Sequence, residues 1–303
     1  MSKYVIQNEK DKMKIAAIIL NYNDWKRCVE LANLIVTYSA LDEVIIIDNR
    51  SSDDSLIELK RCCLSKVHLV CTEKNGGYGY GNNFGMKYAS EQLGCTHALI
   101  CNPDVAFSKE CVLAMRETFE TNIDSRLAVV APVLYEKKEM IQAFKIRNIR
   151  EEILESSIVY VHLFGRKGYS REYFEQHQEC LVDVIPGSLL MVDIMKMSEM
   201  GVYDEKVFLY QEEHILGYQC KKYGYEICLL TTETFKHYHH TPLDSEVKQK
   251  KRMLESKMYY LENYMHISSA YKCFAKIYFA YCMLEIQMVC ILKRMKLNFH
   301  RNL

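Results

Sequence analysis

Short aliphatic runs alternate with helical patterns through the first third of the chain. Continuous apolar runs are typical of strands buried on both faces, and a strand–helix–strand repeat pairs its strands in parallel. The sequence therefore predicts an α/β fold with a mostly parallel central sheet flanked by helices. The predicted strands cover residues 15–20, 44–47, 67–71 and 98–101, and the predicted helices cover 25–38, 52–60 and 82–93.

Composition excludes several classes of protein. Of 303 residues, 49% are hydrophobic, which is enough for a sizeable core, and 39 basic residues balance 39 acidic ones. No global field therefore recruits nucleic acid. The 13 cysteines include no Cys-x-x-Cys pair, so we expect neither a zinc framework nor a disulfide ladder, and buried thiols in a reducing cytosol. Residues 1–14 lack the apolar stretch of a signal peptide, which predicts a cytoplasmic protein.

Polar segments follow each predicted strand at its carboxyl end. In an open α/β sheet, ligands bind in the crevice beyond these ends, so the four segments predict one site. They are Asn21-Tyr22-Asn23, Asp48-Asn49-Arg50-Ser51-Ser52-Asp53, Asn75-Gly76-Gly77-Tyr78-Gly79-Tyr80-Gly81-Asn82-Asn83 and Asn102-Pro103-Asp104.

The glycine cluster after the third strand admits two interpretations. Gly77, Gly79 and Gly81 could let backbone N–H groups approach a phosphate ahead of a helix that begins at Asn82. Their alternation does not match a dinucleotide-binding fingerprint, and a flexible turn would show the same composition.

Asp104 is a candidate ligand for a divalent cation. A carboxylate directly after a buried strand can share Mg²⁺ with water and substrate phosphate, although an Asp that caps a turn has the same sequence signature. Three histidines, His237, His239 and His240, could supply an imidazole to the same ion. Mn²⁺ accepts nitrogen more readily than Mg²⁺ does, and a semi-buried structural histidine is the alternative.

Glu212 and Glu213 follow an apolar and aromatic stretch that could exclude water. Such surroundings raise a carboxyl pKa toward the range useful to a general base. The two side chains diverge by about 100° at a helix start, so one could face the reacting group while the other caps backbone donors. A solvated helix start is the alternative for this pair.

The second half divides into a variable segment, an ordered segment and a tail. Residues 136–178 lack a clean period and are expected to cover the active face. We expect residues 1–243 to form the catalytic domain, with a nucleotide-sugar half at about 14–134 and an acceptor half at about 180–243. Residues 244–303 are expected to form a helical extension. Lys276, Glu285 and Gln287 interrupt the apolar segment 273–292, which favours an amphipathic helix over a spanning one.

The tail has 11 basic and 5 acidic residues, with apolar side chains at helical spacing. This pattern is compatible with peripheral contact at the inner face of the plasma membrane, with a homodimer contact, or with packing on the catalytic domain.

Taken together, seven blocks and a downstream histidine resemble the family 2 glycosyltransferases, in particular their bacterial rhamnosyltransferase-like branch. The resemblance spans about residues 15–240. Besides the four polar segments, with Leu20 and Val105 at their borders, it rests on Gly187-Ser188, Tyr203-Asp204-Glu205, Phe208-Leu209-Tyr210-Gln211-Glu212-Glu213 and His237.

The resemblance implies a GT-A fold and an inverting, metal-dependent transfer of a sugar. The donor would be a dTDP- or UDP-linked sugar and the acceptor a glycan or a lipid-linked hydroxyl in surface polysaccharide synthesis. Glu213 would be the catalytic base with Glu212 beside it, and Asp104 and His237 would bind Mn²⁺ or Mg²⁺. The implied donor residues are Asn21, Tyr22, Asp48, Asn75, Gly77, Asn82 and Asn102, and the acceptor side has Gly187, Ser188 and Tyr210.

Three departures from the family pattern leave an alternative open. Asn102 replaces the first acid of the metal motif, Ile215 replaces a further Asp, and Arg50 replaces a small residue. A catalytically impaired carbohydrate- or nucleotide-binding scaffold would also fit the sequence. A sugar-phosphate nucleotidyltransferase would need a basic Gly-rich loop after the first strand, where this chain has Asn-Tyr-Asn.

Overall fold

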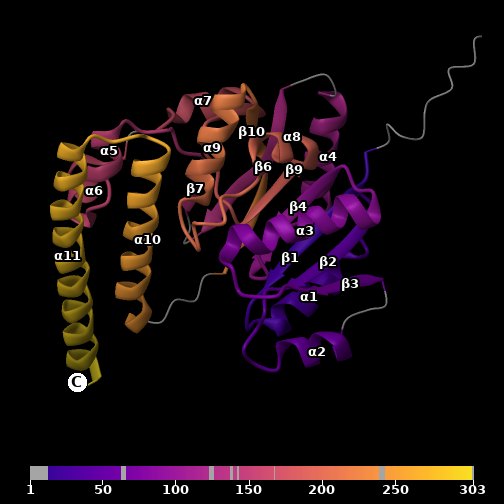
Figure 1. The fold of residues 1–303 in the computed structure, drawn as a ribbon, viewed down its shortest axis with the longest axis horizontal. Coiled ribbons are helices and arrows are strands. Elements are labelled where there is room, and N and C mark those ends of the chain that lie inside the picture. The colour runs from indigo at the N-terminus through magenta and orange to yellow at the C-terminus, as the bar shows by residue number, and fades with distance from the viewer. Residues whose placement is uncertain are drawn as a thin grey trace, which may run out of the picture.

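The computed structural model confirms the α/β class (Figure 1). It describes residues 13–62, 66–122, 126–136, 139–141, 143–166, 168–238 and 243–301. His239 and His240 lie outside these residues.

The first half of the chain forms a parallel sheet in the order β3-β2-β1-β4. The register pairs Asn21 with Asp48, so the polar segments after β1 and β2 begin side by side. The order reverses between β1 and β4, which is the position where a crevice opens beyond the strands. The elements are β1 (Ile15–Asn21), α1 (Trp25–Ile35), β2 (Glu43–Asp48), α2 (Ser55–Cys62), β3 (Val67–Cys71), α3 (Gly77–Leu93) and β4 (His97–Cys101).

The second half continues the same sheet and brings in antiparallel strands. β9 pairs antiparallel with both β4 and β6, whereas β6 and β10 are parallel. These pairings join the two halves into one sheet, as the order β4-β9-β6-β10-β5 shows. The elements are β5 (Val105–Ala106), α4 (Lys109–Thr121), β6 (Leu127–Glu136), β7 (Glu139–Ile141), β8 (Glu179–Val182), β9 (Leu189–Asp193), α8 (Ile194–Met200), α9 (Glu212–Tyr223) and β10 (Glu226–His237).

Helices cover both faces of the sheet because its strands are apolar on both sides. Cys28 of α1 and Cys111 of α4 pack on one face with Ile46. Met86 of α3, Met197 of α8 and Leu216 of α9 pack on the other. The predicted two-sided burial of the strands is therefore confirmed.

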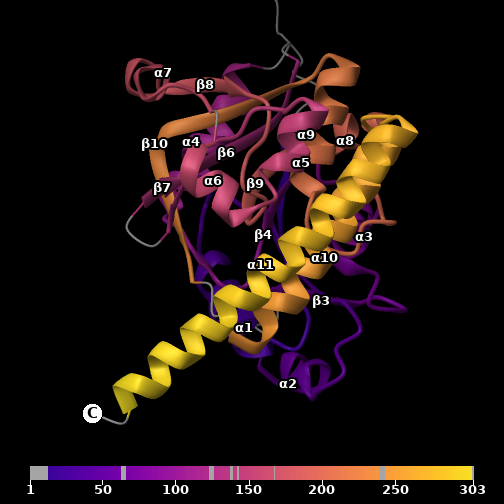
Figure 2. The same ribbon diagram turned by 90° about the vertical axis from the view of Figure 1, so that its left-hand side faces the viewer.

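A third layer is formed by helices outside the sheet (Figure 2). The long α11 packs along α10, and Ile153 of α5 is buried in the same apolar cluster as Leu254 and Phe279. The segment 136–178, which we expected to cover the active face, contains helices that partly support this layer. The helices not yet given are α5 (Ile149–Leu154), α6 (Ile158–Phe164), α7 (Arg171–Gln176), α10 (Leu243–Asn263) and α11 (Ser269–Arg301).

Two predicted helix starts were wrong. The second helix begins at Ser55, whose N–H donates to Asp53 Oδ1 at 2.9 Å, and not at Ser52. The third begins at Gly77 and not at Asn82, because Asn75 Oδ1 accepts the Gly77 N–H at 3.1 Å and turns the chain into the helix. The glycine cluster is therefore helical and is not an open loop.

Candidate functional site

The segments after β1 and β2 are joined by a buried polar network. Asn21 Nδ2 donates to Asp48 Oδ1 at 2.8 Å, and Ser51 Oγ donates to the same oxygen at 2.6 Å. Asn21 and Asp48 are almost fully buried. Arg50, in the same turn, has φ 58°, a region that disfavours a side chain and is held here by its surroundings. The network fixes the two turns at which the family resemblance implies a nucleotide-binding site.

Asp104 and His237 meet although 133 residues separate them in sequence. Asp104 Oδ1 lies 3.0 Å from His237 Nε2, because β10 pairs with β5, which starts directly after Asp104. The Arg27 guanidinium of α1 lies 3.8 Å from Asp104 Oδ2, a neighbour that the sequence analysis did not identify. No group of three or more His, Cys, Asp or Glu side chains suited to a metal occurs within the described ranges. A carboxylate and an imidazole at this spacing suit a partial shell that a substrate phosphate completes.

Glu212 and Glu213 line a small cavity at the start of α9. Its walls include Tyr78, Leu190 and Tyr203, and its volume of about 10 Å³ is close to what one water needs. Burial raises the pKa of both carboxyls, and for Glu212 the neighbouring Glu213 charge raises it further. Glu212 is buried and Oε1 has no hydrogen-bond partner, whereas Glu213 is partly exposed. This pair has the raised proton affinity expected of a general base.

The two acidic residues lie against the predicted acceptor-side residues. A Cβ on Gly187 would lie 2.8 Å from Glu213 Oε1, so a side chain at position 187 would displace this carboxylate from its present position. Ser188 O accepts the Asn102 N–H at 3.0 Å, which ties the segment after β4 to the segment before β9. The structure therefore brings Gly187, Ser188 and Asn102 to the same edge as Glu213.

The helical glycines bring α3 against the loop that precedes α9. A Cβ on Gly77 would lie 2.1 Å from the Phe208 carbonyl oxygen, and the Tyr78 N–H donates to that oxygen at 3.0 Å. The Tyr78 hydroxyl donates to Gly187 O at 2.5 Å. Asn82 is buried within α3, and its amide donates to Tyr78 O. The glycine cluster thus packs against the Phe208–Glu213 segment, a role that the sequence analysis did not foresee.

Backbone geometry sets the direction in which the acidic pair enters α9. Tyr210 and Gln211 have φ values of 72° and 73°, a left-handed pair of non-glycine residues directly before Glu212. Such a turn costs about 1–3 kcal/mol per residue and persists only where packing enforces it.

Tyr22, which follows β1, is 47% exposed.

Helix α10 supplies the packing around this segment. Ser256 Oγ donates to Leu209 O at 2.7 Å, and the Arg252 guanidinium lies 4.8 Å from the centre of the Phe208 ring. The hydroxyls of Tyr259 and Tyr264 both donate to Asp204 Oδ2, at 2.7 and 2.8 Å. The extension is therefore in direct contact with the segment that leads to Glu213. The only signal in sequence is the spacing of these residues on one helix face.

A buried ion pair joins α10 to α5. Lys257 Nζ lies 2.8 Å from Glu152 Oε2 of α5, and both side chains are buried. Although burial raises the pKa of Glu152, the charge and hydrogen bond of Lys257 and the charge of Arg147 lower it overall. Burial lowers the pKa of His214, next to Glu213, to about 4, so this imidazole is neutral at pH 7.

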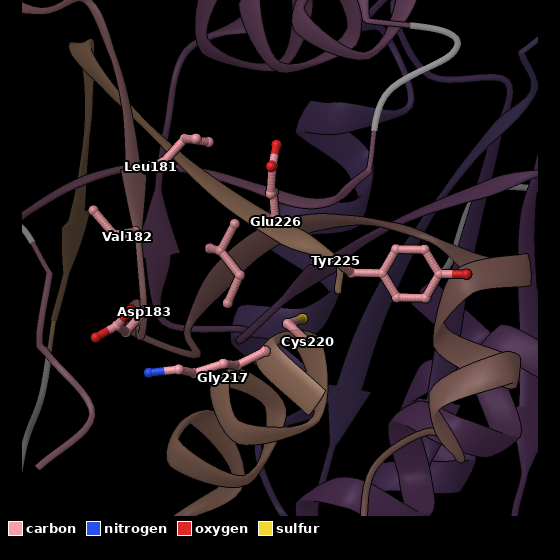
Figure 3. Close-up of a pocket in the computed structure, with 9 residues that line it drawn as sticks. Leu181, Val182, Asp183, Gly217, Cys220, Tyr225 and Glu226 are labelled. Atoms are coloured by element: carbon pink, nitrogen blue, oxygen red, sulfur yellow. The ribbon is translucent and has the colours of Figure 1, made fainter. Parts of the chain in front are cut away.

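A larger hollow of about 210 Å³ lies at the opposite end of α9, between β8 and the start of β10 (Figure 3). Asp183, Cys220 and Tyr225 are among its lining residues. None of the residues that the sequence assigns to the site lines it. The candidate site is therefore the edge described above.

Comparison with known proteins decides the family. The model of glycosyl transferase family 2 matches residues 16–178, more than half of the chain. The chain belongs to glycosyl transferase family 2. The matched range contains Asp48 and Asp104 but ends before Glu213.

Two curated relatives of this glycosyltransferase are hexosyl- or rhamnosyltransferases by name. The low-salt glycan biosynthesis hexosyltransferase Agl10 of Haloferax volcanii is 25% identical over 209 residues, 69% of this chain. The dTDP-rhamnosyl transferase RfbF of Shigella flexneri is 22% identical over 214 residues, also 69% of this chain. The aligned regions span 62% and 64% of these relatives. They support the rhamnosyltransferase-like branch.

Solved structures confirm the GT-A fold. GalNAc-T7, crystallised with UDP, GalNAc and Mn²⁺, superposes with a TM-score of 0.57 at 14% identity, covering 92% of this chain and 57% of that one. S. aureus TarS 1–349 in complex with UDP-GlcNAc gives 0.52 at 12% identity, covering 86% and 69%. At this identity the likeness concerns the fold alone.

Proposed function

We propose that this glycosyltransferase moves a sugar from a dTDP- or UDP-linked donor to a hydroxyl of a glycan or lipid-linked acceptor, with inversion at the anomeric carbon. The observation that carries the proposal is the pair Glu212 and Glu213, which have raised proton affinity. They lie at the edge of the sheet where Asp48 ends β2 and Asp104 follows β4, in the half of the domain that is proposed to bind the donor. The names of the relatives support the donor and the acceptor class.

In this proposal Glu213 accepts the proton of the attacking hydroxyl. As a whole residue Glu213 is the more exposed of the two, and its carboxylate lies against Gly187, on the side where the acceptor is proposed to bind. Glu212 stays buried, and the Glu213 charge raises the pKa of Glu212 further. General-base assistance contributes about 10²- to 10⁴-fold to the rate.

Asp104 and His237 are proposed to hold a divalent cation, Mn²⁺ or Mg²⁺. Their spacing and their oxygen and nitrogen donors fit such an ion. A cation there would offset the negative charge that grows on the departing diphosphate. Arg27, 3.8 Å from Asp104, adds a fixed positive charge on the same side.

The donor-binding wall is proposed to comprise the turns after β1, β2 and β4 together with the start of α3. Asp48 would orient the base or ribose, held in place by its bonds from Asn21 and Ser51. The remaining proposed contacts are Tyr22, Asn75, Gly77, Asn82 and Asn102 on the donor side and Ser188 and Tyr210 on the acceptor side.

Release of nucleoside diphosphate from a panel of dTDP- and UDP-sugars, with added Mn²⁺ or Mg²⁺, tests the proposal. We expect release by the parent protein and loss of transfer in Glu213→Gln with donor affinity retained, because the base acts on the acceptor. Glu172→Gln, an exposed change on α7, is the control. Donor binding without any turnover by the parent would support a binding scaffold. The proton NMR coupling of the product reports the anomeric configuration.

A further inference from the structure

Helix α11 has an apolar face that nothing in the described structure covers. Its exposed side chains recur every three or four residues over about 36 Å of helix. Ile277, Leu284 and Met288 are each 60–68% exposed. The complete stripe comprises Tyr271, Phe274, Ile277, Tyr281, Leu284, Met288, Ile291, Leu292 and Met295. A contiguous patch of this length marks a contact surface.

The charges on α11 are sorted by sign. Among side chains described from residue 269 to 295, the exposed charged ones are all basic, and Lys276 and Arg294 share one flank of the stripe at about 120° from its middle. Glu285, the acid in this range, is buried. It accepts hydrogen bonds from Ser157 Oγ and from the N–H groups of Ile158 and Val159, at 2.9, 2.8 and 2.6 Å. The exposed side therefore complements a negatively charged surface.

An apolar groove continues from the stripe into the contact between α10 and α11. It has a volume of about 260 Å³ and is lined by Leu254, Met258 and Phe279. Lys251, Lys276 and Glu255 also line it, and because Glu255 lies 3.8 Å from Lys251, Lys276 supplies the unbalanced positive charge. Apolar walls next to basic side chains suit an acyl chain and an anionic headgroup.

Helix α6 extends the apolar surface beside α11. Leu163 and Phe164, at its end, are 67% and 71% exposed, and Figure 2 shows α6 on the same side of the molecule as α11. Because Glu285 caps the start of α6, the two helices are held together by the bonds already described.

We propose that the stripe of α11, together with the end of α6, lies on an anionic lipid bilayer. By length and composition Ser269–Met295 could also cross a membrane, with one third of its most apolar window buried in the protein. Spanning would break the Glu285 cap, the 2.9 Å pair between Lys293 and Glu246, and the cluster around Phe279. In this proposal α11 therefore lies in the membrane–water interface, with α10 between it and the segment 204–213 that leads to Glu213. Lipid contact needs no sugar chemistry, so it can fail independently of the proposed reaction.

Sedimentation of the full chain with phosphatidylcholine vesicles, with and without phosphatidylglycerol, tests this surface. We expect binding to the anionic vesicles that weakens as salt rises. L284E/M288E/I291E should lower the partition coefficient at least tenfold while donor affinity is retained. Ile57→Glu with Met195→Glu, which are exposed apolar positions on α2 and α8, should leave binding unchanged.

A milder variant guards against misfolding of the triple glutamate change. Lys276→Gln with Arg294→Gln should lower the partition coefficient about fivefold for each charge removed. Failure of the parent protein to bind anionic vesicles would overturn the proposal. A dimer by light scattering that L284E/M288E/I291E dissociates, with no vesicle binding by the parent, would assign the stripe to a second copy of this chain instead.

Discussion

Helix α10 contacts the segment 204–213, which leads to the proposed base Glu213. This contact predicts that two hydroxyl groups far from Glu213 in sequence affect turnover. Asp204 Oδ2 accepts from both Tyr259 and Tyr264, and the segment that follows Asp204 leads to Glu213. Removing both hydroxyls with Tyr259→Phe and Tyr264→Phe leaves the rings in place. The change therefore tests the hydrogen bonds and not the packing.

The expected cost follows from the partners. A hydrogen bond to a charged acceptor contributes about 1.5–3 kcal/mol. Asp204 is only partly buried, so water replaces part of each bond and the two together should cost about 2–3 kcal/mol. The melting temperature should fall by about 3–6 °C. If a third to a half of that energy holds the segment before Glu213 in its reactive position, kcat falls about three- to tenfold.

The assay compares kcat, donor affinity and thermal stability in one set of variants. Donor affinity should stay within about twofold, because Asp48 and its network do not contact α10. Tyr278→Phe on α11 removes a 3.1 Å bond to Leu154 O of α5 and is the matched control. We expect it to lower stability without lowering kcat at 25 °C. Equal kcat losses in the control and the double variant, or an unchanged kcat in the double variant, would refute the coupling.

Three further predictions concern charges. The Glu213 charge raises the pKa of Glu212 and not the reverse, so Glu212→Gln should leave the acid limb of the pH–rate profile nearly in place; a shift of that limb to lower pH would show that Glu212 is charged when Glu213 titrates. Asp104→Asn should weaken metal-dependent donor binding more than tenfold by calorimetry and His237→Ala less, whereas unchanged affinity in both would remove them from the metal shell. Lys257→Met should lower the free energy of unfolding in urea by about 3–5 kcal/mol, and adding Glu152→Met should restore much of it. Because the folded pKa of Glu152 is below its ordinary value, this pair stabilises above about pH 4.5 and its contribution is lost as pH falls; a flat difference between pH 7 and 4 would contradict it.

The strands and the approximate edge of the site were predictable because both follow from local patterns. The runs at β1 and β2 are apolar on both faces, so the first polar residues after each run mark the end of the strand and the edge of the sheet. The meeting of Asp104 with His237 could be expected only through the family resemblance, since it depends on β10 pairing with β5.

The glycine cluster was misread for a physical reason. Glycine is a poor helix former, so Gly77, Gly79 and Gly81 predict a loop when only local preference is considered. In the structure each lies where a Cβ would meet a neighbour at under 3 Å, namely Phe208 O, Tyr203 Cβ and Leu20 Cδ1. Close tertiary packing outweighs propensity here, and no local pattern reports it.

The two helices of the extension differ in what they contact, and this determines how the tail can be tested. Tyr259 and Tyr260 of α10, and Tyr264 directly after it, lie against the predicted catalytic domain, and Tyr260 is fully buried. A truncation after Leu254 would remove these contacts together with α11, so loss of vesicle binding and loss of turnover would coincide. Point changes on the stripe of α11 leave α10 in place. A defect confined to vesicle binding in L284E/M288E/I291E, and one confined to turnover in the Tyr259 and Tyr264 double variant, would show that adjacent helices serve separate roles.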